Sequence, residues 1–329
     1  MYISGMERNE CQKGTQKTMK RLVATTGLDK KTWLQYRKKG ITGTDAGAIV
    51  GLNPYSSAFQ VYQDKITEET EEFDNESMRQ GRDLEEYVAR RFTEETGLRV
   101  RKANAIYQNV KHPFMLADFD RLVVGQDAGL ECKTASAYSA DKWADGKIPL
   151  HYQMQVQHYL AVSGYRKWYV AALVMGREFI VREVERDEEL IADLITIEEK
   201  FWKDNVLAGV VPAPDGSNAY SDMLAKLYSG DREKSIRLFG MEEQLKRRDE
   251  IDELMQKLER EKAQIDQNIK LKMEDASYAD AEGHRISWVQ SVQQRLDSKK
   301  LKAEQPEIYN KYAKNVESRR FMVKTVPAA

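Results

Sequence analysis

Cysteine, histidine and long apolar runs are scarce in this chain of 329 residues, and each shortage excludes a class of protein. Two cysteines, Cys11 and Cys132, are too few for a disulfide framework, a cysteine-rich zinc site or a four-cysteine iron–sulfur cluster. The four histidines show no H-E-x-x-H or similar spacing, which argues against histidine-ligated metal. No apolar run approaches the roughly eighteen residues of a membrane span, and the polar N-terminus lacks a signal-peptide segment. We therefore expect a cytoplasmic protein without membrane contact.

Charged residues, in contrast, are plentiful and unevenly distributed. They make up 32% of the chain and nearly balance at a net charge of −1. Residues 1–43 carry ten bases and three acids, and residues 299–324 carry eight bases and three acids. Residues 64–76 carry seven acids and one lysine, which favours an exposed loop. The two basic ends fit either solvated faces or contact with nucleic-acid phosphates.

Changes of character along the chain predict four parts. Residues 1–29 form a basic N-terminal extension, in which Met1 to Met19 is polar, aperiodic and expected to be disordered. Residues 30–210 form the main folded domain. Residues 211–240, which include Pro212 and Pro214, are expected to be a linker, and residues 241–329 combine a charged helix with a small α/β extension.

The order of elements within residues 30–210 predicts the fold class. Three short helices are expected between Lys30 and Lys65, and a longer helix from about Arg82 to Thr96 stops at Gly97. The remaining expected elements are strands at 99–109, 115–124, 129–134, 167–175 and 178–185, and helices at 150–163 and 187–208. A tight turn at 125–127 indicates that the second and third strands pair antiparallel. This order predicts an α/β or α+β sandwich with one mixed sheet flanked by helices.

The C-terminal part begins with a helical pattern from Glu242 to Asp275. Its apolar residues recur at three- and four-residue steps: Ile251, Leu254, Leu258, Ile265 and Ile269. The spacing predicts an amphipathic helix with about three heptads of coiled coil. A strand at 285–292, a short helix at 298–312 and a last strand at 319–323 are expected to follow.

Three acids and a lysine on neighbouring strands are the candidate catalytic residues. Glu131 and Lys133 are two apart in a strand and therefore project from one face, where they could form an ordinary surface ion pair. Asp118 and Asp120 lie on the strand expected to pair with them. A carboxylate close to Glu131 repels it unless a cation lies between them, and hard oxygen ligands select Mg²⁺ or Mn²⁺. A neighbouring lysine can then orient water or stabilise charge on a phosphate.

Two helices supply further polar groups. Glu85 lies on a helix whose apolar residues include Val88 and Phe92, so its carboxylate can point inward. Gln155 and Tyr159 are four residues apart on the helix after the sheet and share a face. Glu85 alone, or Gln155 with Tyr159 alone, is compatible with an ordinary solvent-exposed surface. Together with the strand residues, in this order, they form a pattern.

That pattern resembles a nuclease superfamily. The series Gly81-x-x-x-Glu85, Asp120, Glu131-x-Lys133 and Gln155-x-x-x-Tyr159 resembles the RecB-type branch of the PD-(D/E)XK nucleases. The phrases at residues 40–46, 51–55, 130–134 and 155–159 are similar to the lambda-exonuclease-like, YqaJ-type viral recombinase family. The resemblance covers about residues 30–210. It implies a restriction-endonuclease-like core, with a C-terminal extension of the kind that some phage and prophage members carry.

The resemblance also implies a role for each motif residue. Asp120, Glu131 and the backbone carbonyl of Cys132 would bind one or two Mg²⁺ or Mn²⁺ ions. Lys133 would position the attacking water. The other catalytic-motif residues would support this centre: Glu85 supports the metal from its helix, Gln155 holds Lys133 or a phosphate, and Tyr159 completes the motif. In lambda-like members an arginine and a hydroxyl residue grip a DNA 5′-phosphate, and Arg37 and Thr44 occupy those positions here.

One departure concerns the second metal ion. The founding exonuclease has an additional metal-binding carboxylate on the strand before the catalytic aspartate, where this chain reads Asn109-Val110-Lys111-His112. Asp118 is the candidate replacement.

These observations lead to one functional expectation and three rivals. We expect a Mg²⁺-dependent deoxyribonuclease, a 5′→3′ exonuclease on linear duplex DNA that supplies 3′ single strands to a RecT-like annealing protein and that can form homo-oligomers. One rival is an endonuclease or single-strand nuclease using the same site. A second is a catalytically inactive DNA-binding or scaffold protein, and a third is an interaction protein built around the helix at 242–275.

Overall fold

A computed structural model describes residues 18–68, 74–228, 230, 233–314 and 320–324. The chain divides into two compact units, Met1–Tyr228 and Ser229–Ala329. The segment expected to be disordered, Met1 to Met19, lies outside the described residues except for its last two. Across the described ranges, no helix is both long enough and apolar enough to cross a membrane.

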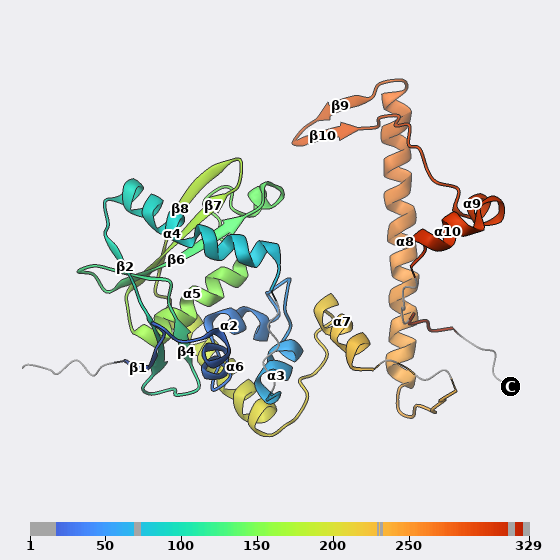
Figure 1. The fold of residues 1–329 in the computed structure, drawn as a ribbon. Coiled ribbons are helices and arrows are strands. Elements are labelled where there is room, and N and C mark those ends of the chain that lie inside the picture. The colour runs from blue at the N-terminus through green and yellow to red at the C-terminus, as the bar shows by residue number, and fades with distance from the viewer. Residues whose placement is uncertain (1–17, 69–73, 229, 231–232, 315–319, 325–329) are drawn as a thin grey trace, which may run out of the picture. The chain divides into compact units, whose positions relative to one another are not determined.

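A five-stranded mixed sheet forms the centre of the first unit (Figure 1). Its strands, in spatial order, are β2 (Val100–Lys102), β5 (Arg121–Val123), β6 (Ala128–Ala135), β7 (Lys167–Val174) and β8 (Glu178–Glu185). The β6–β7 pair is parallel, and the other three pairs are antiparallel. The β5–β6 pairing confirms the antiparallel pair predicted from the turn at 125–127.

Helices cover both faces of this sheet. Alternate residues of β7 pack to opposite sides, because successive side chains of a strand point to opposite faces. Trp168 and Val170 join the core beneath α5 (Leu150–Ser163), whereas Tyr169 and Ala171 join the cluster beneath α4 (Glu76–Thr96). The predicted class, a mixed sheet flanked by helices, is confirmed.

A second, smaller sheet was not expected from the sequence. It consists of β1 (Met19–Ala24), β3 (Ala105–Asn109) and β4 (Leu116–Asp118) in the order β1-β3-β4, all antiparallel. Strand β1 lies within the segment expected to be an N-terminal extension. A register shift between Arg21 and Val23 breaks the alternation by which a strand is recognised in a sequence.

Both long β runs expected around this region are broken and shared between the two sheets. The run at 99–109 divides at Asn104, which has a left-handed φ of 52°, into β2 of the larger sheet and β3 of the smaller. The run at 115–124 divides between Asp118 and Arg121 into β4 and β5. The prediction that 115–124 is one strand is therefore wrong, and Asp120 lies in the break.

The other helical segments of the first unit follow the expected order, except that the 3₁₀ turn and the last helix were not expected. They are α1 (Lys30–Arg37), α2 (Gly43–Ile49), α3 (Ala58–Ile66), a 3₁₀ turn at Ala137–Lys142, α6 (Glu188–Lys200), a π-helical turn at Phe201–Leu207 and α7 (Asn218–Leu227). Helix α4 begins six residues earlier than expected, because the side chain of Asn75 caps the amide of Met78 at 2.9 Å.

Helix α7 falls within the segment expected to be a linker, residues 211–240. Its Tyr220 is buried, packs at a tilt against Phe59 with ring centroids 4.7 Å apart, and donates a hydrogen bond to the carbonyl of Pro212. Residues up to Tyr228 thus pack with the first unit.

The second unit begins with the expected long helix, α8 (Glu242–Met273), which ends two residues early. A hairpin follows, β9 (Tyr278–Ala281) and β10 (His284–Ser287), in place of the single strand expected at 285–292. The helix expected at 298–312 is divided at Gln305 into α9 (Ser298–Glu304) and α10 (Pro306–Tyr312). The strand expected at 319–323 is absent from the described residues 320–324.

Candidate active site

Strand β6 presents Glu131 and Lys133 on the face beneath α5, as the period of a strand predicts. The Glu131 side chain is 4% exposed, and its Oε1 atom lies 2.6 Å from Nζ of Lys133. The same Nζ lies 4.5 Å from the centre of the Tyr152 ring. The two charges therefore form a buried pair and not a surface one.

Helix α5 contributes a glutamine that joins both members of this pair. Gln155 Nε2 donates to Glu131 Oε1 at 2.6 Å and to the Tyr159 hydroxyl at 2.8 Å. Lys133 Nζ donates to Gln155 Oε1 at 3.1 Å. A Cβ atom at Gly43 would lie 2.3 Å from the Tyr159 ring, so the glycine allows α2 to approach this network.

Asp120 reaches the site because it directly precedes β5, at the point where the pairing of β5 with β6 stops. The ladder between β5 and β6 stops at the pair Arg121–Leu130, which leaves the Cys132 amide without a strand partner on that side. The Asp120 Oδ2 atom accepts that N–H at 2.8 Å. Burial, together with the charges of Glu131 and Glu85, raises the pKa of Asp120 well above its usual value.

Lys133 remains a cation in this setting. Burial by itself lowers the pKa of its ammonium group, but the Glu131 carboxylate, with smaller contributions from Tyr152 and Asp120, outweighs burial and raises it. A fixed positive charge therefore lies beside two carboxylates.

The carboxylates fit a divalent cation. The Glu131 Oε2 atom is buried and has no hydrogen-bond partner among the described residues, and Asp120 is held near a second carboxylate against their repulsion. A cation placed there would bind the Glu131 Oε2 atom and offset the repulsion between the two carboxylates, and hard oxygen donors suit Mg²⁺ or Mn²⁺. The described residues contain no group of three or more His, Cys, Asp and Glu side chains arranged to hold a metal. Mg²⁺ is typically held by one or two carboxylates and several waters, so two are sufficient.

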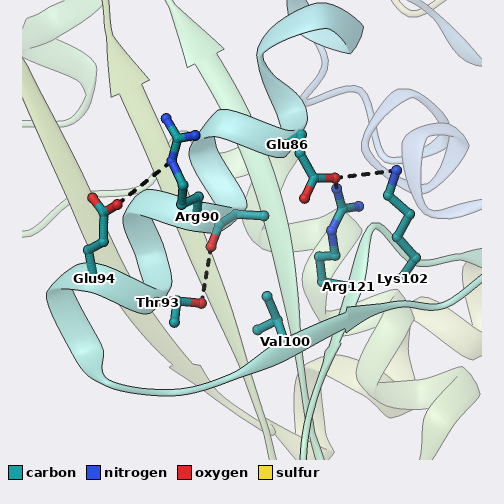
Figure 2. A pocket seen from close by; sticks show the side chains of 8 residues that line it. Glu86, Arg90, Thr93, Glu94, Val100, Lys102 and Arg121 are labelled. Carbon is teal, nitrogen blue, oxygen red and sulfur yellow. Dashed lines mark hydrogen bonds and ion pairs between the residues drawn. The ribbon is translucent and has the colours of Figure 1, made fainter.

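Glu85 faces an arginine that the sequence analysis missed. Arg121, whose side chain is 4% exposed, pairs with Glu85 and lies 3.0 Å from Glu86. Lys102 also approaches Glu86, at 3.3 Å, and Figure 2 shows both ion pairs of Glu86. Glu85 therefore forms an ion pair with Arg121, and its expected support of a metal stays a prediction. The only available signal was that Arg121 is the sole base in the otherwise apolar and acidic run 115–124.

Asp118 is likewise engaged elsewhere. Its carboxylate accepts a hydrogen bond from Arg37 Nη1, while Arg37 Nη2 donates to Thr44 Oγ1 at 2.9 Å and to Thr42 Oγ1 at 3.1 Å. The Arg37 guanidinium also lies over the Trp33 ring, 4.6 Å from its centre. The structure thus brings Arg37 and Thr44 together as expected and pairs Asp118 with Arg37, while the role of Asp118 as a replacement metal ligand stays a prediction.

A second buried ion pair supports this arginine. Lys65, whose side chain is 1% exposed, lies 2.8 Å from the Asp45 carboxylate, which also accepts the Thr42 amide at 2.8 Å. Although burial opposes it, the charges of Lys65 and Arg37 lower the pKa of Asp45. Asp45 belongs to the Gly40–Ala46 phrase, but nothing in the sequence indicated its pairing with Lys65.

One cavity of about 1160 Å³ connects the two groups of residues. Thr44 lines it at one place, and Asp120, Glu131 and Lys133 line it at another. Trp33, Leu34, Met78 and Val88 give it an apolar wall. Buried carboxylates, a cationic lysine and an open cavity on a mixed sheet define an α+β protein with a candidate metal-assisted catalytic centre.

Comparison with known proteins identifies the family. The family model of the YqaJ-like viral recombinase domain matches residues 32–166. The uncharacterized protein YqaJ of Bacillus subtilis (strain 168) is 38% identical over 317 residues, which cover 95% of this chain and 99% of that protein. The chain belongs to the YqaJ-like viral recombinase family, which confirms the predicted resemblance.

Solved structures also match this chain. The alkaline exonuclease LHK-Exo of Laribacter hongkongensis, in complex with dAMP, is 21% identical with a TM-score of 0.48 and covers 60% of this chain and 99% of its own. A phage-related exonuclease of Haemophilus somnus 129PT is 13% identical with a TM-score of 0.40, covering 54% of this chain and 99% of its own.

Proposed function

We propose that this protein is a Mg²⁺-dependent deoxyribonuclease, a 5′→3′ exonuclease that degrades one strand of linear duplex DNA. The observation that carries the proposal is the buried Oε2 of Glu131, which lies beside Asp120 and Lys133 and has no hydrogen-bond partner in the part of the chain that the structure describes. Membership of a viral recombinase family, and the likeness to proteins named as exonucleases, agree with it.

Asp120 and Glu131, with the backbone carbonyl of Cys132, would hold one or two Mg²⁺ or Mn²⁺ ions. A bound divalent cation supplies Lewis-acid chemistry, which polarises the phosphodiester and makes nearby water more acidic. The Asp120 carboxylate would then be ionised, since a cation offsets the burial and the carboxylate repulsion that otherwise raise its pKa. Hydrogen bonding from the Cys132 amide fixes the direction in which that carboxylate points.

Lys133 would position the attacking water or neutralise charge on the scissile phosphate. Its ammonium group has three donors, and two contacts, to Glu131 and Gln155, hold it in place. Tyr159 in turn accepts a hydrogen bond from Gln155 and so orients the amide. These residues would act as one preorganised unit.

Arg37 and Thr44 would bind the 5′-phosphate at the end of the strand being degraded. A guanidinium suits two-pronged capture of a phosphate, and Asp118 and Thr42 hold this one in position. Because Thr44 lines the same cavity as the carboxylates, a strand anchored there could extend to the catalytic centre. The 3′ single strand left behind would be the substrate of a RecT-like annealing protein.

Digestion of linear and covalently closed plasmid, with and without Mg²⁺, tests the proposal, and end-labelling maps the polarity. We expect Mg²⁺-dependent loss of linear DNA only, starting from 5′ ends. Cutting of closed circles would instead establish an endonuclease, and digestion restricted to single-stranded DNA would establish a single-strand nuclease.

Three variants test the centre itself. Asp120→Ala, Glu131→Ala and Lys133→Ala should each lower the cleavage rate by about 100-fold or more, while DNA binding persists. Lys147→Ala is the matched control, because Lys147 belongs to an exposed ion pair with Asp145. Near-wild-type cleavage by all three folded variants would refute the nuclease site.

A further inference from the structure

Helix α8 carries an uncovered apolar stripe along one face. Ile251, Leu254, Leu258 and Ile265 are exposed to 42%, 50%, 64% and 53%, and Ile269 continues the same three- and four-residue spacing. Met273 is the only buried residue of the helix. Aliphatic side chains aligned on one helical face in this way mark a packing surface.

The helix is supported along its length by its own ion pairs. Arg247 contacts Glu250 at 3.0 Å, Arg248 contacts Asp252 at 2.9 Å, and Lys262 contacts Asp266 at 3.0 Å. Pairs at these spacings favour the helical state without tertiary packing. The stripe is therefore presented on a preformed helix.

The net charge of each half of α8 distinguishes the two ways in which such helices can pair. Residues 242–259 contain seven acids and four bases, a net of −3, whereas residues 260–273 contain four bases and two acids, a net of +2. A parallel pair would bring acidic half against acidic half. An antiparallel pair brings the acidic half of each helix against the basic half of the other, and it also opposes the two helix dipoles.

Glu261, the one acid at the core positions of the stripe, also favours the antiparallel pair. With Ile251, Leu258 and Ile265 as the first core position of each heptad, Leu254, Glu261 and Asn268 take the second. A parallel pair would set Glu261 against its own copy, and like charges at close range repel. In an antiparallel pair that crosses near residue 260, Glu261 lies opposite Leu258 and close to Lys262 of the other helix.

We propose that α8 is a self-association surface, which pairs antiparallel with α8 of a second copy of this chain and crosses it near Arg260. In this arrangement Leu254 packs against the partner's Ile265. The two copies of Leu254 are then about 16 Å apart along the axis, at about 1.5 Å per residue. The proposal is independent of the nuclease activity, and it would join two catalytic units in one molecule.

Disulfide trapping of the full-length chain tests the orientation. In a Cys11→Ser, Cys132→Ser background, Leu254→Cys and Ile265→Cys proteins are oxidised separately and as a mixture. A disulfide requires Cα atoms within about 7 Å, so only the mixture should form a cross-linked dimer. Gln256→Cys, on the opposite face of the helix, controls for random collision. Cross-linking of each single-cysteine protein by itself would show a parallel pair and overturn the proposal.

Light scattering tests the association itself. The wild-type chain should have twice the monomer mass at micromolar concentration, and Leu258→Glu should reduce it to the monomer mass with unchanged far-ultraviolet circular dichroism. Leu271→Glu is the matched control, because Leu271 is 75% exposed and lies off the stripe, and it should remain a dimer. A monomeric wild-type chain, or equal loss of mass in both variants, would overturn the proposal. Neither outcome bears on DNA cleavage, so the two proposals can fail separately.

Discussion

The two units of this chain differ in how completely each buries its own apolar side chains. In the first, the core beneath α5 and the cluster beneath α4 enclose both faces of the sheet, and even polar groups such as Glu131 and His158 are buried. In the described part of the second, Met273 is the only buried residue, and α8 exposes its leucines and isoleucines. The first unit is a closed structure that can hold a reactive site, whereas the second presents surface to a partner.

A buried histidine in the first unit provides the largest expected difference in stability between the two units. His158 Nδ1 lies 2.8 Å from Glu198 Oε1, and its Nε2 lies 2.8 Å from the carbonyl of Leu116, with both charged side chains 0% exposed. When Glu198 is ionised both partners are acceptors, so both ring nitrogens donate and the ring is a cation. Burial lowers the pKa of His158, but the Glu198 charge and both hydrogen bonds outweigh burial and raise it.

His158→Ala should lower the free energy of unfolding by about 3–5 kcal/mol, because it leaves Glu198 buried without a counter-charge. The folded-state pKa lies above the unfolded value of 6.5, so this stabilisation is fully present below pH 6.5 and is lost as the pH rises through the folded pKa. Denaturant unfolding of wild type and variant between pH 6 and 9 should show the difference shrinking with pH.

The second unit provides the matched control for that pair. Lys262 and Asp266 lie 3.0 Å apart with side chains 78% and 45% exposed, so Lys262→Ala should change stability by at most about 0.5 kcal/mol. A difference for His158→Ala that stays constant with pH would contradict the proposed charge on the ring.

Two leucine substitutions compare packing in the same way. Leu160 is 0% exposed in α5, and Leu160→Ala should cost about 2–5 kcal/mol through lost burial and a residual cavity. Leu271 is 75% exposed in α8, and Leu271→Ala should stay within about 0.5 kcal/mol. Denaturant midpoints measure both, and a comparable loss in the two variants would show that the second unit is packed after all.

Truncation locates the point at which the first unit becomes complete. A chain ending at Tyr228 should fold and retain the site, since α7 and its contact with Phe59 are kept. A chain ending at Asp215 loses Tyr220 and should be less stable by about 1.5–3 kcal/mol, the value for one large buried side chain. Thermal unfolding of both chains measures this, and equal stability would place the boundary earlier, at the linker expected from residue 211.

Local periodicity was sufficient to predict much of the site. Glu131 and Lys133 share a face because strands have a period of two, and Gln155 and Tyr159 share one because they are a helical turn apart. Gly97 ended its helix as expected, and the helix expected at 150–163 ends before Gly164, each glycine with a left-handed φ. These features depend on residues close together in the sequence.

The features of the site that could not be predicted depend on pairing between residues far apart in the sequence. Asp118 and Asp120 lie in one continuous β-like run, yet Asp118 pairs with Ile106 in the smaller sheet, whereas Arg121 pairs with Leu130 in the larger. The two aspartates therefore have different partners, Arg37 and the Cys132 amide. The Arg121–Glu85 pair joins residues that are 36 positions apart, a separation that helical or strand periodicity cannot reveal.

The smallest expected effect concerns the choice of DNA ends by the first unit. If Arg37 and Thr44 bind a 5′-phosphate, wild-type protein should degrade phosphorylated duplex about tenfold faster than dephosphorylated duplex, equivalent to about 1.4 kcal/mol. Arg37→Ala should erase the difference, and Arg37→Lys should restore part of it, because lysine keeps the charge but not the two-pronged geometry. Initial rates on the two end-labelled substrates measure the preference.

The control for end recognition comes from the second unit, where Arg247 also forms a helix-surface ion pair and is 64% exposed. Arg247→Ala should leave the ratio of the two rates unchanged. Asp118→Asn should weaken the preference in the same direction as Arg37→Ala, because Asp118 holds the guanidinium in place. Equal rates on both substrates with the wild-type protein would remove the 5′-phosphate role from Arg37 and leave Asp118 with a purely structural one.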